Sequence, residues 1–249
     1  KHFIHDSYSS RNFKGTHAGN NQAEAFLGKS TFNWTRQSHV LKCDVRKFFD
    51  SIDHKILLSI VGKKVSDEKL FNLITDIVSS FSVTLGKGLP LGNVTSQILA
   101  NVYMNEFDQY MKHGLKVKYY IRYCDDFALV HESEKILKDT ILLVRTFLVE
   151  RLKLELHPKK IIMKKIRQGV DFLGYVSLPG YRVIRTRTKR RMFKKVVEVD
   201  QLRKLGKISI EQFKQVLESY KGMLSHGKSK GLVSRLNLKI NHQISSKTS

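Results

Sequence analysis

The chain is 249 residues long, with 41% hydrophobic and 27% charged residues, which fits one folded domain plus an appendage. Its 45 Lys and Arg residues outnumber 22 Asp and Glu residues, so the formal net charge is +23 and an anionic partner is expected, nucleic acid before membrane. No apolar run is long enough to span a bilayer and the first residues lack the apolar segment of a signal peptide, so we expect a cytoplasmic protein with no membrane partner.

Only two cysteines occur, Cys43 and Cys124, and each precedes an Asp in a predicted strand. Their number excludes a disulfide framework, and the Cys-x-x-Cys spacing of many metal sites is absent. We expect both to be small buried residues in a reducing compartment. The chain begins without a Met and in mid-pattern, so we also expect a piece of a longer protein.

The first half of the chain predicts one strand and several helices. Residues 1–37 are polar and irregular, and we expect loops there. A strand over 40–45 ends near Asp44 and is followed by two aromatic residues, Phe48 and Phe49. Apolar residues at helical spacing predict a helix over 54–64 and another that opens with Ser66 as its cap. After a turn-rich break over 86–92, Thr95 or Ser96 is expected to cap a long helix.

The middle of the chain predicts a hairpin with two adjacent carboxylates at its tip. Residues 119–123 and 127–130 are rich in aromatic and β-branched types, which favour strands, and Asp125 and Asp126 lie between them. A helix is predicted to run to about residue 151, and short strands are predicted near 153–156, 161–164, 170–176 and 181–184.

A basic segment begins near residue 182, where we expect a domain boundary. Residues 182–195 contain no acid and eight basic residues: Arg182, Arg185, Arg187, Lys189, Arg190, Arg191, Lys194 and Lys195. Such a block repels itself unless an anion neutralises it. Helices are predicted near 189–204, 209–225 and 229–241, the second with a capping box formed by Ser209 and Gln212.

The two adjacent carboxylates are the strongest functional signal. A lone Asp-Asp pair is usually a solvated turn, but like charges side by side repel, and Mg²⁺ favours such hard oxygen ligands. If the strand that ends at Asp44 lies in the same sheet, carboxylates from separate segments converge at one edge. Such a cluster can hold two metal ions that clamp the entering and leaving oxygens of a phosphoryl transfer.

Several ordered motifs carry a family resemblance. Asp44-x-x-x-Phe48-Phe49, Gly92-x-x-x-Ser96 and Tyr123-Cys124-Asp125-Asp126 resemble motifs A, B and C of reverse transcriptases. Residues 154–160 are similar to motif D and residues 172–175 to the motif E primer grip. The resemblance implies an α+β fold of the right-hand polymerase type. It predicts partial fingers over 1–37, a palm over 38–181 with an antiparallel sheet backed by helices and a fingers insertion near 54–90, and a basic helical thumb over 182–249.

The same resemblance implies roles for individual residues. Asp44, Asp125 and Asp126 would bind two Mg²⁺ ions, with Mn²⁺ as a substitute, and Lys160 would protonate the departing pyrophosphate or simply be solvated. Phe49 would exclude a ribose 2′-OH as a steric gate, or serve core packing. The full expected dNTP site is Val45, Arg46, Phe48, Phe49, Leu91 and Gly92, with Arg46 alternatively an exposed ion partner. The primer grip is expected at Phe172, Leu173, Gly174 and Tyr175, and phosphate contacts at Arg182, Arg185, Arg187, Lys189, Arg190 and Arg191.

Motif B departs from the usual pattern of the family. Leu91 stands where most members have a Gln, and Gln97 where they have a Pro, a pattern that resembles the enzymes of diversity-generating retroelements. That subtype implies error-prone copying of a template RNA into cDNA, with a bound RNA/cDNA duplex, a small basic accessory protein oligomer as partner, and a bacterial or phage-encoded source. Leu91 would lower fidelity by removing a polar contact, or would merely pack the turn. The alternatives are another bacterial reverse transcriptase (group II intron, retron or phage-defence type) and a non-catalytic nucleic-acid-binding remnant.

Overall fold

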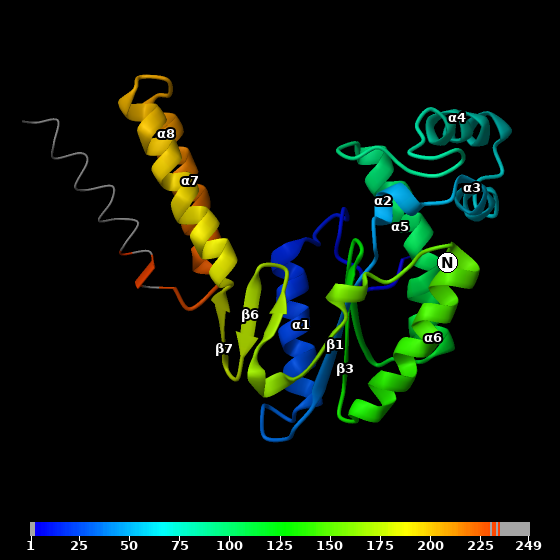
Figure 1. Ribbon diagram of the computed structural model, residues 1–249, viewed down its shortest axis with the longest axis horizontal. Helices are drawn as coiled ribbons and strands as arrows, with labels where there is room; N and C mark the ends of the chain where they lie inside the picture. Colours follow the sequence, from blue (N-terminus) through cyan, green and yellow to red (C-terminus); the bar gives the residue numbers. More distant parts are fainter. Residues whose placement is uncertain (1–2, 230, 233, 235–249) are drawn as a thin grey trace, which may run out of the picture. The chain divides into compact units, whose positions relative to one another are not determined.

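Two compact units make up the chain, Lys1–Ile166 and Arg167–Ser249. The computed structural model describes residues 3–229, 231–232 and 234 of them (Figure 1). The boundary predicted near residue 182 falls inside the second unit, because the first two strands of that unit precede residue 182 and its third strand contains it. The division into fingers, palm and thumb therefore stays a prediction, and each unit is described in turn.

The first unit is built on a four-stranded antiparallel sheet. Its strands are β1 (His39–Asp44), β2 (Tyr119–Tyr123), β3 (Asp126–His131) and β4 (Ile162–Lys165), in the order β2-β3-β1-β4. The strand that ends at Asp44 thus lies directly beside the hairpin, as predicted, and Asp44 is the register partner of Asp126. The predicted α+β class, with an antiparallel sheet backed by helices, is confirmed.

Both faces of this sheet are covered. Leu41, Phe127 and Leu129 point to a core shared with α5 (Val94–Gln109) and α6 (Glu134–Leu152). Because side chains alternate along a strand, the neighbouring residues face the other way, where α1 (Thr16–Ser30) contacts β2 and β3. There the rings of Phe26 and Tyr119 lie 5.4 Å apart. Figure 1 shows α1 and α6 flanking β1 and β3.

The expectation that residues 1–37 are only loops is wrong, because α1 occupies 15 of them. Most of its residues are polar, which hides the few apolar positions that pack, chiefly Ala23, Phe26 and Leu27. These three residues are spaced so that they lie on one face of a helix, but the apolar face is short and the rest of the sequence is typical of a surface segment.

Two predicted helix caps are also wrong. The helix α4 (Glu68–Ser79) is capped by Asp67, whose side chain accepts from the Leu70 amide, and not by Ser66. The helix α5 begins after Asn93, ahead of Thr95 and Ser96. Asp and Asn are as good at caps as Ser, so residue type alone does not select among neighbours. The short α2 (Phe48–Ser51) and α3 (His54–Gly62) precede them, and Asp53 caps α3.

The strand predicted over 153–156 is not formed. After α6 the chain runs extended beside the end of β1, where Val45 and Leu156 form an isolated bridge. A single 3-10 turn, η2 (Pro158–Lys160), leads into β4, and a second, η3 (Ile166–Gln168), crosses into the next unit. Earlier in the chain, the C-terminal end of α5 continues into the π-helical turn η1 (Tyr110–Gly114).

The second unit combines a three-stranded antiparallel sheet with two helices. Its strands are β5 (Val170–Phe172), β6 (Tyr175–Leu178) and β7 (Tyr181–Ile184), and its helices are α7 (Thr186–Lys204) and α8 (Ile210–Ser225). The strand predicted over 170–176 is two strands, because Leu173 and Gly174 have φ of 46° and 90° and make a two-residue hairpin turn. The Ser209–Gln212 capping box is confirmed.

The helix predicted over 229–241 lies almost entirely outside the described residues. Across the ranges that the structure describes, no helix is long and apolar enough to cross a membrane.

Replacing Phe107 by Ala should strongly destabilise the first unit. The Phe107 ring is fully buried, 5.0 Å from the ring of Phe127 and 6.0 Å from that of Tyr120, and removal of a buried Phe costs about 3–5 kcal/mol. Urea unfolding followed by the fluorescence of the single tryptophan, Trp34 in the first unit, measures the loss. Leu142→Ala, at a position 63% exposed, is the control and should change stability by less than about 0.5 kcal/mol.

Candidate active site

Three carboxylates from separate parts of the chain meet at one end of the first sheet. Asp44 is the last residue of β1, Asp126 is the first of β3, and they oppose one another in register. Directly opposed residues project to the same face with Cα atoms about 4.5–5.5 Å apart. Asp125 adjoins them in the turn between β2 and β3. The structure therefore brings together the three acids that the sequence singles out.

Burial and mutual repulsion shape the protonation of this group. The pKa of Asp125 is raised, first because the carboxyl is partly buried and then because Asp44 and Asp126 lie nearby. Asp44 itself is only 8% exposed. Three acids so placed are unfavourable unless positive charge balances them.

Two lysines supply part of that charge. The amino group of Lys160 donates to both oxygens of Asp44, at 2.8 and 2.9 Å. This hydrogen bond, more than the charges of the three acids, raises the pKa of Lys160, although partial burial opposes the shift. The Lys42 amino group lies 3.8 Å from an Asp126 oxygen. The predicted site residue Lys160 is thus in direct contact with Asp44.

The backbone after α6 places Lys160 there. The Arg46 amide donates to the Glu155 carbonyl and the His157 amide to the Asp44 carbonyl, both at 2.8 Å. These bonds align residues 155–157 with the end of β1 and bring η2 alongside Asp44. Residues 155–157 therefore pair with the end of β1 through hydrogen bonds, as an edge strand would, but they do not form a regular strand.

The donor set suits a hard divalent cation. Carboxylate oxygens on rigid strands are the ligands that Mg²⁺ prefers. However, within the described part of the chain no group of three or more His, Cys, Asp or Glu side chains is arranged so that it could hold a metal ion. Lys160 already occupies both oxygens of Asp44, so a metal ion at Asp44 would compete with that amino group.

The residues expected to contact a nucleotide differ in their surroundings. Val45 and Phe48 are buried, while the ring of Phe49 is half-buried and meets that of Phe48 edge to face at 5.4 Å. Arg46 is an exposed ion partner of Glu155 at 3.6 Å, as in its alternative interpretation. The Phe49 carbonyl accepts from the Leu89 amide at 2.9 Å, which joins the segment before Leu91 to α2.

Leu91 and Gly92 lie on the surface. Leu91 is 73% exposed, so it does not pack the turn before α5. Gly92 has a φ of 94°, a conformation that favours glycine, and no atom lies within 4 Å of where a Cβ would be. Ser96 of the same motif is buried, and its neighbour Gln97 accepts from the Ser10 hydroxyl at 2.7 Å.

The predicted primer grip belongs to the second unit. Phe172 and Tyr175 are buried there, and the Tyr175 hydroxyl donates to the Met223 carbonyl at 2.9 Å. Leu173 and Gly174 form the hairpin turn between them. The two aromatic residues therefore anchor the turn that the resemblance assigns to primer contact.

Some of the predicted phosphate-binding cations have partners within the unit. The guanidinium of Arg182 lies 5.6 Å from the centre of the Tyr175 ring, and Arg185 forms an ion pair with Asp171. Lys189 is half-buried. The remaining members of the set are exposed on α7: Arg187, Arg190 and Arg191.

Sequence reasoning missed a buried ion pair next to the carboxylates. Arg122 of β2 is 1% exposed and Asp108 of α5 is fully buried, with 2.6 Å between Arg122 Nη2 and Asp108 Oδ2. Burial alone lowers the pKa of Arg122, but the charge and hydrogen bonds of Asp108 reverse the shift and raise it. The signal available beforehand was an Arg inside an otherwise aromatic and β-branched strand, which a buried charge partner explains.

Comparison with known proteins gives one family match and several partial relatives. The family model described as reverse transcriptase (RNA-dependent DNA polymerase) matches residues 1–177. Protein YkfC of Escherichia coli is 26% identical over 62% of this chain and 49% of its own length. The group II intron-encoded protein LtrA of Lactococcus lactis is 31% identical over 30% of this chain and 14% of its own. The chain thus spans half or less of these relatives.

Among solved structures, the apo telomerase of Candida tropicalis is similar in fold. It superposes with a TM-score of 0.55 at 12% identity, over 77% of this chain and 40% of the telomerase chain. The telomerase of Candida albicans, solved in complex with a fragment of telomeric RNA, gives 0.52 at 13% identity over 68% of this chain and 34% of its own. At such identities the likeness concerns the fold alone.

Replacing Asp125 by Asn should stabilise the metal-free protein at neutral pH. Because the pKa of Asp125 is raised in the folded state, the ionised carboxylate disfavours folding at pH above that value. The gain should shrink as the pH falls through the raised pKa of Asp125 toward the ordinary carboxylate range near about 4, because the wild-type carboxyl then becomes neutral, like the Asn side chain.

Thermal unfolding across this pH range, in the presence of a chelator, measures the effect. Each kcal/mol of relief corresponds to roughly 2–4 °C in a chain of this length. Asp139→Asn, on the exposed side of α6, is the matched control and should leave the midpoint unchanged. An equal midpoint for Asp125→Asn and wild type at neutral pH would contradict the expectation.

Proposed function

We propose, from the premise that this chain belongs to the reverse transcriptase (RNA-dependent DNA polymerase) family, that it copies RNA into DNA by metal-assisted nucleotidyl transfer. The observation that carries the proposal is the meeting of Asp44, Asp125 and Asp126 at one end of a sheet inside the family-matched region. Lys160 beside Asp44 adds a proton donor to the same group.

The three carboxylates would hold two Mg²⁺ ions, with Mn²⁺ as a substitute. Bound there, the metal pair supplies Lewis-acid stabilisation of the entering and leaving oxygens of the phosphoryl transfer. The protein's own part is to keep the three acids on one face against their repulsion, through the register of β1 with β3 and the lysines nearby. Little other covalent help is needed, since positioning and charge dominate this chemistry.

Lys160 would act as the general acid for the departing pyrophosphate. Its raised pKa keeps the amino group protonated at neutral pH, so Nζ carries a proton that it can donate to a leaving oxygen. The contact with Asp44 holds the amino group at the metal-binding carboxylate while substrate is absent.

Phe49 would exclude ribonucleotides by steric clash with the 2′-OH. Its ring packs against the hydrophobic core of the first unit but stays half-buried, which supports a dual role in packing and in shaping the nucleotide site. Backbone groups of Val45, Arg46 and Phe48 and the exposed Leu91–Gly92 turn are proposed to complete that site.

The second unit would hold the RNA/cDNA duplex through its phosphates. Arg187, Arg190 and Arg191 are exposed on one turn of α7 and suit such contacts, whereas Arg182 and Arg185 already have partners in the unit. An A-form hybrid offers few readable base edges, so recognition by shape and phosphate is expected. The Leu173–Gly174 turn is proposed to meet the primer.

The subtype is the finer part of the proposal. Leu91 and Gln97 in motif B favour the error-prone enzyme of a diversity-generating retroelement, which would also work with a small basic accessory protein oligomer. The partial likeness to LtrA favours a group II intron type instead. The exposure of Leu91 supports the first reading, because an exposed residue of that turn is free to contact the nascent base pair.

Primer extension on an RNA template with dNTPs and Mg²⁺ tests the activity. Wild type should extend the primer, and Asp44→Ala should lower the rate by at least about 10³-fold because a metal ligand is lost. Asp139→Asn keeps the same loss of one charge at a distant exposed position and should extend normally. Duplex binding without extension by the wild-type protein, with the accessory protein present, would favour the non-catalytic remnant.

Replacing Leu91 by Gln tests the subtype. If Leu91 lowers fidelity by omitting a polar check on pairing, Leu91→Gln should reduce misincorporation opposite template adenines, by about 10-fold for one restored hydrogen bond. Sequencing of the cDNA products measures the error spectrum. Val94→Gln, at a neighbouring position that is 70% exposed, controls for a polar side chain on the same surface. An error spectrum unchanged by Leu91→Gln would reject this role.

A further inference from the structure

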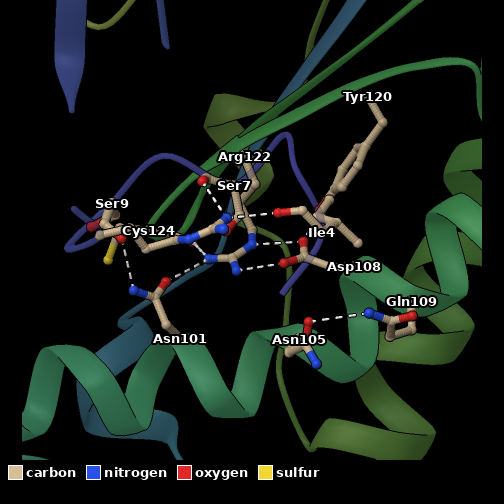
Figure 2. Close-up of polar contacts among 11 residues, drawn as sticks. Ile4, Ser7, Ser9, Asn101, Asn105, Asp108, Gln109, Tyr120, Arg122 and Cys124 are labelled. Carbon is tan, nitrogen blue, oxygen red and sulfur yellow. Dashed lines mark hydrogen bonds and ion pairs between the residues drawn. The ribbon is translucent and has the colours of Figure 1, made fainter. Parts of the chain in front are cut away.

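Helix α5 is tied to the strand before the carboxylate turn by a dense set of hydrogen bonds. Arg122 Nε donates to Asp108 Oδ1 at 2.7 Å and Nη2 to Oδ2 at 2.6 Å, so the carboxylate is held at both oxygens. The Tyr120 hydroxyl donates to the same Oδ1 at 2.7 Å. Figure 2 shows these side chains converging between α5 and β2.

The same guanidinium also holds the turn itself. Nη1 of Arg122 donates to the Cys124 carbonyl at 2.8 Å and to Asn101 Oδ1 at 3.2 Å. Cys124 has a φ of 56°, a left-handed conformation that is unfavourable for a residue with a side chain. The Cys124 carbonyl belongs to the peptide bond that joins Cys124 to Asp125. The hydrogen bond from Arg122 therefore stabilises a strained turn next to three acids that repel one another.

An N-terminal segment joins this arrangement from the other side. The Arg122 amide donates to the Asp6 carbonyl at 3.0 Å, and the Tyr8 amide donates to the Arg122 carbonyl at 2.9 Å. The Asn101 amide nitrogen donates to the Ser9 carbonyl at 2.8 Å. Arg122 is therefore fixed through its backbone and its side chain by three separate parts of the chain.

Stability alone does not explain an ion pair in this place. Removing two charges from water costs about as much as their attraction returns, and a well-packed apolar pair is often equally stable. What an apolar pair cannot do is donate to the Cys124 carbonyl. Arginine can satisfy a carboxylate with two nitrogens and still direct a third at other acceptors, which lysine cannot.

We propose that Arg122 is a positioning residue, which, anchored by Asp108 and Asn101, fixes the Cys124–Asp125 turn so that Asp125 is held in place to bind metal. Its effect on catalysis rests on the proposed function, but its effect on metal binding does not.

The decisive variant removes the hydrogen bond from residue 122 to the Cys124 carbonyl without leaving an unpaired buried charge. Arg122→Met combined with Asp108→Leu and Tyr120→Phe replaces the polar groups by apolar ones of similar size, so folding is retained while the donor to Cys124 is lost. Arg122→Lys is the second variant, because it keeps a positive charge beside Asp108 but has a single nitrogen. Circular dichroism and Trp34 fluorescence establish folding, and assays are run well below each melting temperature.

Binding of Mn²⁺ to the protein without nucleic acid, followed by electron paramagnetic resonance, is the first readout. Both variants should bind Mn²⁺ about 10- to 100-fold more weakly than wild type, the usual effect of losing a group that orients a metal ligand. In primer extension, kcat should fall by a similar factor while KM for dNTP changes by less than about twofold, because the ground-state nucleotide contacts are intact.

Asn105→Ala is the matched control. Asn105 lies on α5 between Asn101 and Asp108, and its side chain accepts only from Gln109 at 3.4 Å among the contacts drawn in Figure 2. This variant should bind Mn²⁺ and extend primers like wild type.

Two results would overturn the proposal. In the first, the folded variants bind Mn²⁺ as tightly as wild type. In the second, every substitution that removes the hydrogen bond to Cys124 also unfolds the protein, because Arg122 would then be purely structural. A wild-type chain that binds Mn²⁺ but extends no primer would refute the proposed function while leaving the positioning role to be decided by the metal titration.

Discussion

The structure of the first unit depends on holding like charges together. Asp44, Asp125 and Asp126 repel one another, and burial makes their charges harder to accommodate, as the raised pKa of Asp125 indicates. The antiparallel register of β1 and β3 forces two of them into opposition, and the hairpin turn adds the third. A fold has no stability reason to build such a cluster, so the cluster marks the place where structure serves chemistry.

Different parts of the chain offset that repulsion in different ways. Lys160 arrives on a segment that follows β1 through backbone hydrogen bonds, and Lys42 reaches Asp126 from within the sheet. Asp108, which is buried and near the hairpin, adds no further repulsion because Arg122 neutralises it. The cations in this region thus differ in burial: the Lys160 side chain beside Asp44 is half exposed, whereas Arg122 is buried and held by its hydrogen bonds to Asp108.

The sequence predicts the elements whose signals are local and misses those that depend on distant partners. The hairpin, α3 and the Ser209–Gln212 cap follow from residue type and spacing, and the resemblance to reverse transcriptase motifs A and C implies that Asp44 meets the hairpin. By contrast, α1 has only a narrow apolar stripe, and residues 153–156 are extended without completing a strand, because their hydrogen bonds depend on β1. The sequence places Arg122 in a strand but does not reveal its ion partner, because Asp108 lies on a separate helix. Likewise, the partners of Arg182 and Arg185 emerge only once the second unit is folded.

The way the first sheet ends has a consequence for how copies of this protein behave toward one another. On one side, the backbone of β2 is already engaged by the segment around Ser7, which bridges to Arg122. On the other, the last strand is the short β4, which carries exposed Lys164 and Lys165. Open strand edges invite intermolecular pairing, and lysines on a short edge discourage it. Because the net charge is +23, pairing of sheet edges between two copies would also have to overcome the electrostatic repulsion between them. The same charge that opposes self-association attracts polyanions.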